Sequence, residues 1–135
     1  MRIAKLVEIR ELEKVTEEKR RHNLTELVSR GQIEIYIGRK DTSPFATTQS
    51  DIILGEDENG NPSTAPLIIR RISRKQARIT YNPEADTYYI EDCSTKGNTR
   101  VNKDQLGIFE KRPLKAGDRL TLGESDYAVV FQQES

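Results

Sequence analysis

Groups suited to binding an anion recur in three polar segments of this 135-residue chain. They are Arg39, Ser73, Thr95, Lys96 and Gly97. Together they offer a planar guanidinium, two hydroxyls, an ammonium and a backbone N–H with no side chain in front of it. A phosphate dianion needs both hydrogen-bond donors and opposite charge. These residue types predict an anion site if the fold brings the three segments together.

Side chains for metal binding or nucleophilic catalysis are scarce. Cys93 and His22 are the only cysteine and the only histidine, too few for a zinc site or an internal disulfide. His22 ends the charged run that starts at Glu17, so we expect a solvated histidine rather than a catalytic base. Cys93 is expected to be small and half-buried at a strand end. We therefore expect no enzyme activity, no metal and no cofactor.

The composition limits the class of partner. The chain has 22 basic and 22 acidic residues and 34% apolar residues. A zero net charge disfavours a general nucleic-acid binder. The apolar runs, such as 128–131, are far shorter than the roughly 18 residues of a membrane span. Charges interrupt the first residues before a signal peptide can form. We expect a soluble, intracellular protein, cytoplasmic or, in a eukaryote, nuclear, with one domain and no membrane partner.

From residue 32 onward, short runs with strand character alternate with turn signals. Residues 33–37 alternate strictly between apolar and polar positions, as a half-buried strand should. Proline at position 83 and the Gly117-Asp118 pair mark turns. This pattern is typical of an all-β sandwich or barrel. Further strands are expected at 51–54, 67–72, 77–81, 87–91, 119–122 and 127–132.

Residues 1–30 differ from the rest, with eight basic and six acidic side chains and no proline or glycine. Apolar residues at 6, 9, 12 and 15 allow a helix with one apolar stripe. The alternative is a strand over 3–9, a charged loop and a second strand around 24–28. The local pattern leaves both open, and we treat 1–30 and 31–135 as two segments.

Strand directions predict where the polar loops lie. If 33–37 runs upward and each later segment reverses direction, the loops at 38–39, 73–76 and 93–99 all fall at the upper end. The polar, turn-rich segment 55–66, with acidic residues at 56–58, then falls at the lower end as a mobile loop. The anion-seeking groups would thus meet at one end of the fold.

Five blocks in this order carry a family resemblance. Segments 36–39, 51–54, 72–79, 89–102 and 114–123 resemble the forkhead-associated (FHA) domain, over roughly residues 33–131. The resemblance implies a two-layer antiparallel β-sandwich of the SMAD/FHA type that binds phosphothreonine peptides through loops at one end. It also implies that residues 1–30 supply the first strands, which favours a strand over 3–9.

The resemblance assigns roles unevenly. Arg39 and Ser73 match the arginine and serine that contact the phosphate, and Arg74 follows where it can face the ligand. Gln76 stands where the family has a loop-bracing histidine, and an amide can replace its hydrogen bonds.

In the third loop the family's Asn-Gly is exchanged to Gly97-Asn98. In one register Thr95 and Lys96 face the phosphate, and Asn98 takes the place of a left-handed glycine. In the other, Lys96 is an insertion and Asn98 reaches the ligand.

The expected partner is a threonine-phosphorylated protein or peptide, made by a Ser/Thr kinase. Five basic residues between 67 and 79 form either a solvated strand face or a rim that attracts acidic flanking residues. The exchanged Gly97-Asn98 pair and Gln76 support an alternative. In that reading the fold is an assembly module that binds its partner independently of phosphorylation.

Overall fold

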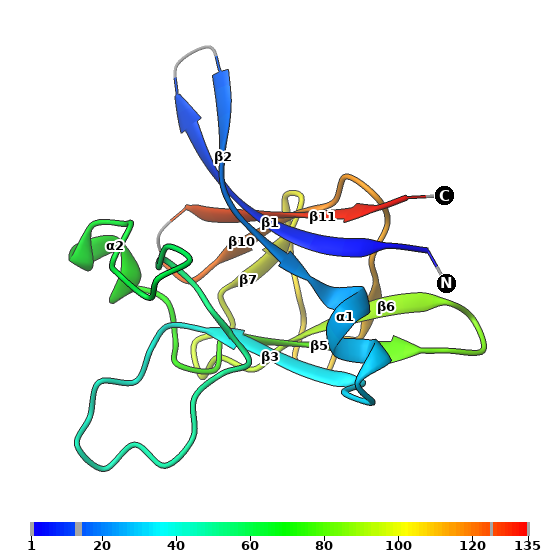
Figure 1. Ribbon diagram of the computed structural model, residues 1–135, viewed down its shortest axis with the longest axis horizontal. Coiled ribbons are helices and arrows are strands. Elements are labelled where there is room, and N and C mark those ends of the chain that lie inside the picture. The colour runs from blue at the N-terminus through cyan, green and yellow to red at the C-terminus, as the bar shows by residue number, and fades with distance from the viewer. Residues whose placement is uncertain (1, 13–14, 125, 135) are drawn as a thin grey trace.

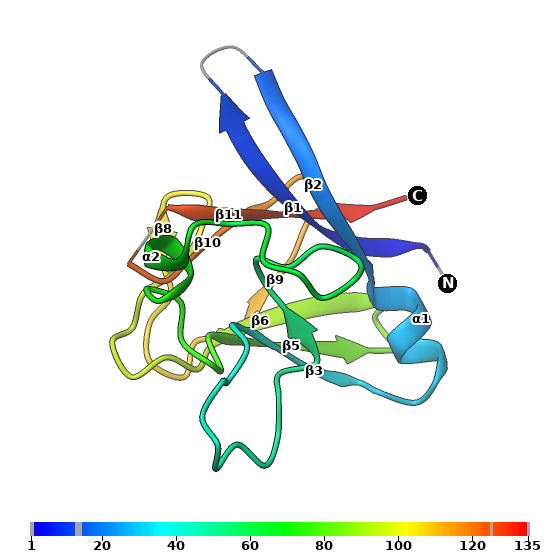
Figure 2. The ribbon, with the colours of Figure 1, turned by 60° about the vertical axis from the view of Figure 1, so that its left-hand side comes forward.

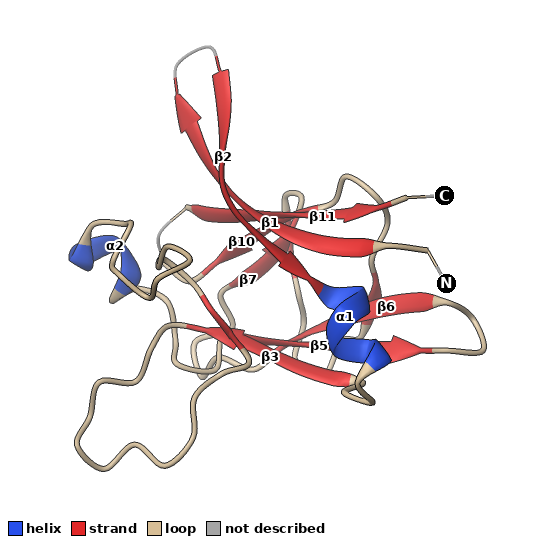
Figure 3. Ribbon diagram, viewed as in Figure 1, coloured by secondary structure: helices blue, strands red, loops and turns tan. Residues whose placement is uncertain are grey.

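The structure is a computed structural model that describes residues 2–12, 15–124 and 126–134. Two β-sheets pack face to face (Figures 1 and 3). The strands are β1 (Ala4–Leu12), β2 (Val15–Asn23), β3 (Glu34–Gly38), β4 (Ile52–Ile53), β5 (Ala77–Asn82), β6 (Thr87–Asp92), β7 (Thr99–Val101), β8 (Asp104–Gln105), β9 (Arg112–Pro113), β10 (Arg119–Leu122) and β11 (Tyr127–Gln133). Two short helices, α1 (Leu24–Ser29) and α2 (Pro66–Ile69), complete the described elements.

The strand order is β2-β1-β11-β10-β7-β8 in one sheet and β4-β3-β5-β6-β9 in the other. Alternate residues of β1, β3, β5, β6 and β11 point between the sheets and, with residues of the neighbouring elements, form one apolar core. Tyr88 and Phe131 meet across it, with ring centroids 5.6 Å apart. The predicted two-layer β-sandwich is confirmed. In the described ranges no helix is both long and apolar enough to cross a bilayer.

The N-terminal segment forms a β-hairpin followed by a helix. β1 pairs with both β2 and β11, which confirms the strand over residues 3–9. The expected charged loop is wrong, because those charges lie on β2, an edge strand, where charged side chains discourage further pairing. The hairpin extends past the end of the β1–β11 pairing and projects from the sandwich (Figures 1 and 2).

The strand expected around residues 24–28 is wrong as well, since this segment is α1. Asn23 caps the helix by accepting a hydrogen bond from the Glu26 N–H at 3.0 Å. Asparagine followed three residues later by glutamate is a helix-start signal that outweighs the apolar pattern. Leu24 and Val28 then point into the core from one helix face.

Two further expectations fail near the middle of the chain. Residues 67–72 are not a strand, because Pro66 starts the short helix α2 there. β4 runs parallel to β3, with Ile37 opposite Ile52. The chain therefore leaves β4 at the same end as Gly38, and segment 55–66 does not lie at the opposite, acidic end that simple alternation of direction predicts.

A buried carboxylate connects the hairpin to the rest of the fold. Glu8 is 1% exposed and lies 2.5 Å from Nε2 of His22. It also accepts hydrogen bonds from the Tyr127 hydroxyl and, at 2.8 Å, from the Gly55 N–H. The expectation of a solvated His22 is wrong, because its side chain is only 10% exposed. The period-2 pattern places His22 opposite Leu6, on the core side of β2.

These contacts also set the acidity of Glu8. Burial raises its pKa, but the hydrogen bonds from His22, Tyr127 and Gly55 outweigh burial, so the pKa lies below the ordinary value of 4.5. Ionised Glu8 therefore stabilises the fold above about pH 4.5. This contribution is lost as the pH falls through the folded-state pKa.

We predict that Glu8→Gln lowers the free energy of unfolding at pH 7 by about 2–4 kcal/mol, because three donors lose a charged, buried acceptor. Urea unfolding at pH 7 measures the loss, and the same titration between pH 3 and 5 should show a shallower pH dependence in the variant. Glu17→Gln, an exposed change of the same kind on β2, serves as the control. Equal stability of the two variants would contradict the role of Glu8.

Candidate anion-binding site

The first two polar loops approach each other closely at the end of β3. The Arg39 N–H donates to the Ser73 carbonyl at 3.2 Å. A Cβ on Gly38 would lie 2.0 Å from the Arg74 carbonyl oxygen, so only glycine permits this approach. The Ser50 hydroxyl also donates to that carbonyl. The Gly-Arg pair thus places the Arg39 side chain beside the Ser73 loop.

Gln76 joins the second loop to the third. Its side chain is fully buried; its Oε1 accepts from the Ser73 N–H at 2.9 Å. Its Nε2 donates to Asn98 Oδ1 and to Thr99 Oγ1, both at 2.9 Å. The amide therefore supplies the loop-bracing hydrogen bonds that the resemblance assigns to a histidine.

Asp92 organises the third loop from the end of β6. Its Oδ1 accepts from the Ser94 hydroxyl and from the Thr99 hydroxyl, both at 2.7 Å. Ser94 in turn accepts from the Asn98 N–H at 3.2 Å. Gly97 has φ +63°, whereas Asn98 does not have positive φ. The register that gives Asn98 a left-handed position is therefore wrong, and Gly97 makes the turn.

A pocket of about 600 Å³, which we call the loop pocket, lies where these loops meet. Of the predicted site residues, Arg39, Ser73, Arg74 and Thr95 line it. The convergence of loops 38–39, 73–76 and 93–99 at one end is confirmed. Residues 41 and 48–50, from the long loop after Arg39, form another wall. The sequence shows these residues only as polar loop residues. Their place at the loop pocket depends on the pairing of β4 with β3.

The other three predicted residues are engaged elsewhere. Lys96 Nζ lies 3.0 Å from Glu124 Oε1 in an exposed ion pair. The Gly97 carbonyl accepts from the Gln105 side chain. Asn98 turns inward to Gln76, so its amide does not face the loop pocket. None of these three lines the loop pocket, whereas the neighbouring Ser94, which was not predicted, does.

Positive charge dominates the loop pocket. Arg39, Arg74 and Lys75 line it, against one carboxylate, Asp41. Arg74 Nε lies 3.4 Å from Asp41 Oδ1, and Lys75 stacks over the Tyr36 ring at 4.8 Å from its centroid.

Arg39 makes no ion pair within the described ranges. Its buried Nε lacks a hydrogen-bond partner. Its Nη1 makes a long contact of 3.4 Å with the Lys40 carbonyl. Since buried polar groups are normally satisfied, this guanidinium has capacity for an anionic acceptor.

Cys93 also borders the loop pocket, half-buried just after β6. Burial raises the pKa of its thiol, which disfavours the reactive thiolate. This agrees with the expectation of a small packing residue.

Comparisons with solved structures show the same fold. Full-length yeast Pml1p shares 20% identity over 99% of this chain and 83% of its own, with a TM-score of 0.68. An FHA domain of an Arabidopsis thaliana hypothetical protein shares 17% identity over 100% and 88%, with a TM-score of 0.59. The N-terminal FHA domain of Saccharomyces cerevisiae Rad53p, solved with a phosphothreonine peptide, shares 18% over 98% and 94%, with a TM-score of 0.57.

The search of curated proteins found no match. The FHA domain family model, however, matches residues 35–123, which is more than half of the chain. The matched region contains all three loops that form the loop pocket. This chain therefore belongs to the FHA domain family.

Proposed function

We propose that this chain is a phosphothreonine-dependent interaction module, in which the loop pocket holds the phosphate of a partner protein. The observation that carries the proposal is Arg39, whose half-buried guanidinium has an unsatisfied Nε and no counter-ion in the described part of the chain. A phosphate of nearly two negative charges supplies both the missing acceptor and the missing charge.

The other groups in the loop pocket complete such a site. The hydroxyls of Ser73 and Thr95 offer neutral donors, and Arg74 is held only by a long contact to Asp41. Exposed ion pairs of this kind contribute about 1 kcal/mol or less, so a phosphate competes for Arg74 at little cost. Rad53p and Dun1 FHA domains were solved with phosphothreonine peptides, which supports the choice of ligand.

A second function is favoured by the third loop. Lys96 and Asn98, which the resemblance assigns to ligand binding, are occupied by Glu124 and Gln76. An FHA fold with these groups engaged can serve as an assembly surface without phosphate dependence. Pml1p, a similar structure, is described as integrated into the RES complex.

Titration of the chain with a degenerate phosphothreonine peptide library separates the two functions. The same library in phosphoserine and unphosphorylated form is measured in parallel by fluorescence anisotropy. We expect binding of the phosphothreonine form and at least tenfold weaker binding of the plain form. Equal binding of phosphorylated and plain peptides would reject the proposal and favour the assembly module.

We predict that Arg39→Ala weakens phosphopeptide binding by about tenfold or more, since a hydrogen bond to a charged group contributes roughly 1.5–3 kcal/mol. Ser73→Ala should weaken it less, because it removes one neutral donor. Arg30→Ala is the matched control, an exposed arginine at the end of α1. Circular dichroism checks that each variant is folded. Unchanged affinity in a folded Arg39→Ala variant would contradict the role of Arg39.

We further predict that Gln76→Ala lowers the free energy of unfolding by about 2–4 kcal/mol, because it leaves the Ser73 N–H, Asn98 Oδ1 and Thr99 Oγ1 without their buried partner. Urea unfolding measures this loss, and phosphopeptide affinity should fall at the same time as the loops lose their common support. Gln132→Ala, at an exposed position of β11, is the control. A loss no larger than that of the control would contradict the bridging role of Gln76.

A further inference from the structure

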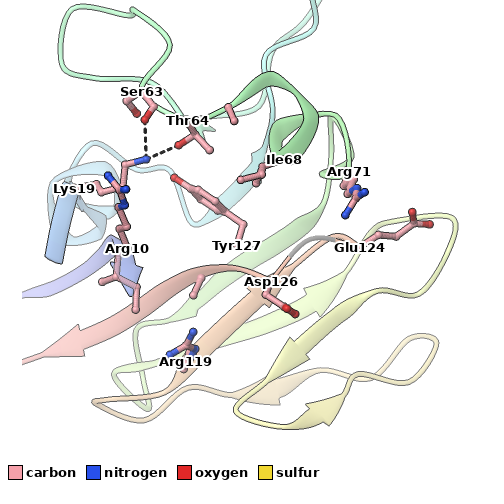
Figure 4. A pocket seen from close by; sticks show the side chains of 13 residues that line it. Arg10, Lys19, Ser63, Thr64, Ile68, Arg71, Arg119, Glu124, Asp126 and Tyr127 are labelled. Atoms are coloured by element: carbon pink, nitrogen blue, oxygen red, sulfur yellow. Dashed lines mark hydrogen bonds between the residues drawn. The ribbon is translucent and has the colours of Figure 1, made fainter. Parts of the chain in front are cut away.

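A second pocket, of about 650 Å³, lies beside the β1–β2 hairpin, and we call it the hairpin pocket. Figure 4 shows Arg10 and Lys19 on one side of it and Arg71 on the other, with Tyr127 and Ile68 between them. These residues come from the hairpin, from α2 and the turn after it, and from the start of β11. Arg71 is one of the five basic residues for which the sequence predicts either a solvated strand face or a rim that attracts acidic flanking residues, whereas the sequence assigns no ligand to the other four.

Lys19 is aimed at this pocket by an irregularity in β2. Glu8 pairs with Arg20 and Ile9 pairs with Glu18, so the register skips Lys19. A β-bulge of this kind redirects a side chain and is common beside binding sites. Lys19 Nζ donates to the Ser63 carbonyl at 2.9 Å and to the Thr64 hydroxyl. Both acceptors are neutral, so the ammonium charge is not compensated by either contact.

The surroundings of Lys19 disfavour its charge. Burial is the main cause that lowers the pKa of Lys19. Arg10 lowers it further, and Glu8 and Glu17 raise it, with a net lowering. Glu8 is already satisfied by His22, Tyr127 and Gly55. An anion beside Lys19 and Arg10 would relieve the repulsion between the two cations.

Contacts within the fold hold the two other sides of the hairpin pocket, formed by Tyr127 and by Arg71. Tyr127 is held from below by its hydrogen bond to buried Glu8. The Arg71 carbonyl accepts from the Glu124 N–H at 3.1 Å. A Cβ on Gly123 would lie 2.2 Å from that carbonyl oxygen, and Gly123 has φ +81°, so glycine is required for this approach. Arg71 is thus anchored through its backbone while its side chain stays exposed.

The charges of the hairpin pocket are unbalanced. Its two carboxylates pair with cations that do not line the pocket: Glu124 with Lys96, and Asp126 with Arg100 at 3.0 Å. Asp126 is also 92% exposed. Glu17 lies opposite Arg10 in the register. Among the described residues, however, neither Arg10 nor Arg71 takes part in an ion pair.

The two pockets share no lining residue, but one lining residue of each lies close to the other along the chain. Arg71 lines the hairpin pocket and Ser73 lines the loop pocket. Two residues span at most about 7 Å of chain. An extended peptide advances about 3.3 Å per residue, so one ligand can reach both pockets with a spacing of a few residues.

From this geometry we propose that the hairpin pocket binds an acidic segment of the same partner that places its phosphothreonine in the loop pocket. Carboxylates pair with Arg10, Lys19 and Arg71, while an apolar side chain of the segment rests on Ile68 and Tyr127. The inference rests on the proposed function for the identity of the partner. It adds a second contact, which selects among phosphorylated sequences.

Two half-ligands test the pockets separately by NMR. An unphosphorylated peptide rich in glutamate should shift the amide resonances of Thr64, Arg71 and Tyr127. A phosphothreonine peptide with neutral flanks should shift those of Arg39, Ser73 and Thr95. If the glutamate peptide shifts the hairpin-pocket resonances but the phosphothreonine peptide does not shift the loop-pocket resonances, the proposed function is rejected and the acidic site is supported. A glutamate peptide that causes no shifts at the hairpin pocket would overturn this inference.

A joined ligand then tests the coupling. In a series of phosphothreonine peptides, glutamate or glutamine is placed at each position within about six residues of the phosphate. At the best position glutamate should strengthen binding about two- to fivefold at low salt, as expected for one exposed carboxylate beside these cations. The double variant Arg10→Gln, Lys19→Gln should bring this ratio close to one, whereas Arg30→Gln should keep it. A ratio unchanged by the double variant would overturn the proposal.

Discussion

The loop pocket of this FHA domain depends on the hydrogen bonds that the fully buried side-chain amide of Gln76 makes. The amide lies between loops of the two sheets, which the Thr99–Asp92 hydrogen bond also joins. One side of the amide accepts from the Ser73 backbone and the other donates to Asn98 and Thr99. An amide can do both because it carries a donor and an acceptor at once. The loop pocket is therefore braced from the core side by a side chain that does not itself line it.

Glu8 is a second buried polar side chain whose hydrogen bonds join distant segments of the chain. A carboxylate on the core side of β1 is costly unless each oxygen is satisfied, and here donors from β2, β11 and Gly55 meet it. The interaction ties the hairpin to the segment that follows β4. Both pockets thus depend on a buried polar side chain that joins parts of the chain far apart in sequence.

Much of the sandwich could be predicted from the sequence, because strand alternation and turn residues are local signals. Strands near 77–82, 87–92, 119–122 and 127–133 lie where expected. The convergence of Arg39, Ser73 and Thr95 also followed from the strand count. It followed although two assumptions behind that count, an antiparallel β4 and a strand at 67–72, are wrong, because the two errors cancel for the later strands. Together they misplaced segment 55–66, which lies between them.

His22 and Asn98 were misread for a common physical reason, which is that partners distant in sequence decide their contacts. His22 reads as a surface residue until β2 pairs with β1 and brings it to Glu8. Asn98 reads as a ligand group until Gln76 takes its side chain. The helix at 24–29 is different, since its signal, Asn23 with Glu26, was local and readable.

The place of β1 within its sheet has a practical consequence. The family match begins at residue 35, yet β1 covers one side of β11, with Leu6 opposite Phe131. A fragment shortened only at its N-terminus, to residue 35, would lose β1 and leave β11 as a bare, apolar sheet edge. Such an edge recruits strands from other molecules, so the shortened domain would be prone to self-association and aggregation. The charged β1–β2 hairpin therefore covers the apolar edge of β11 and prevents its pairing with other molecules.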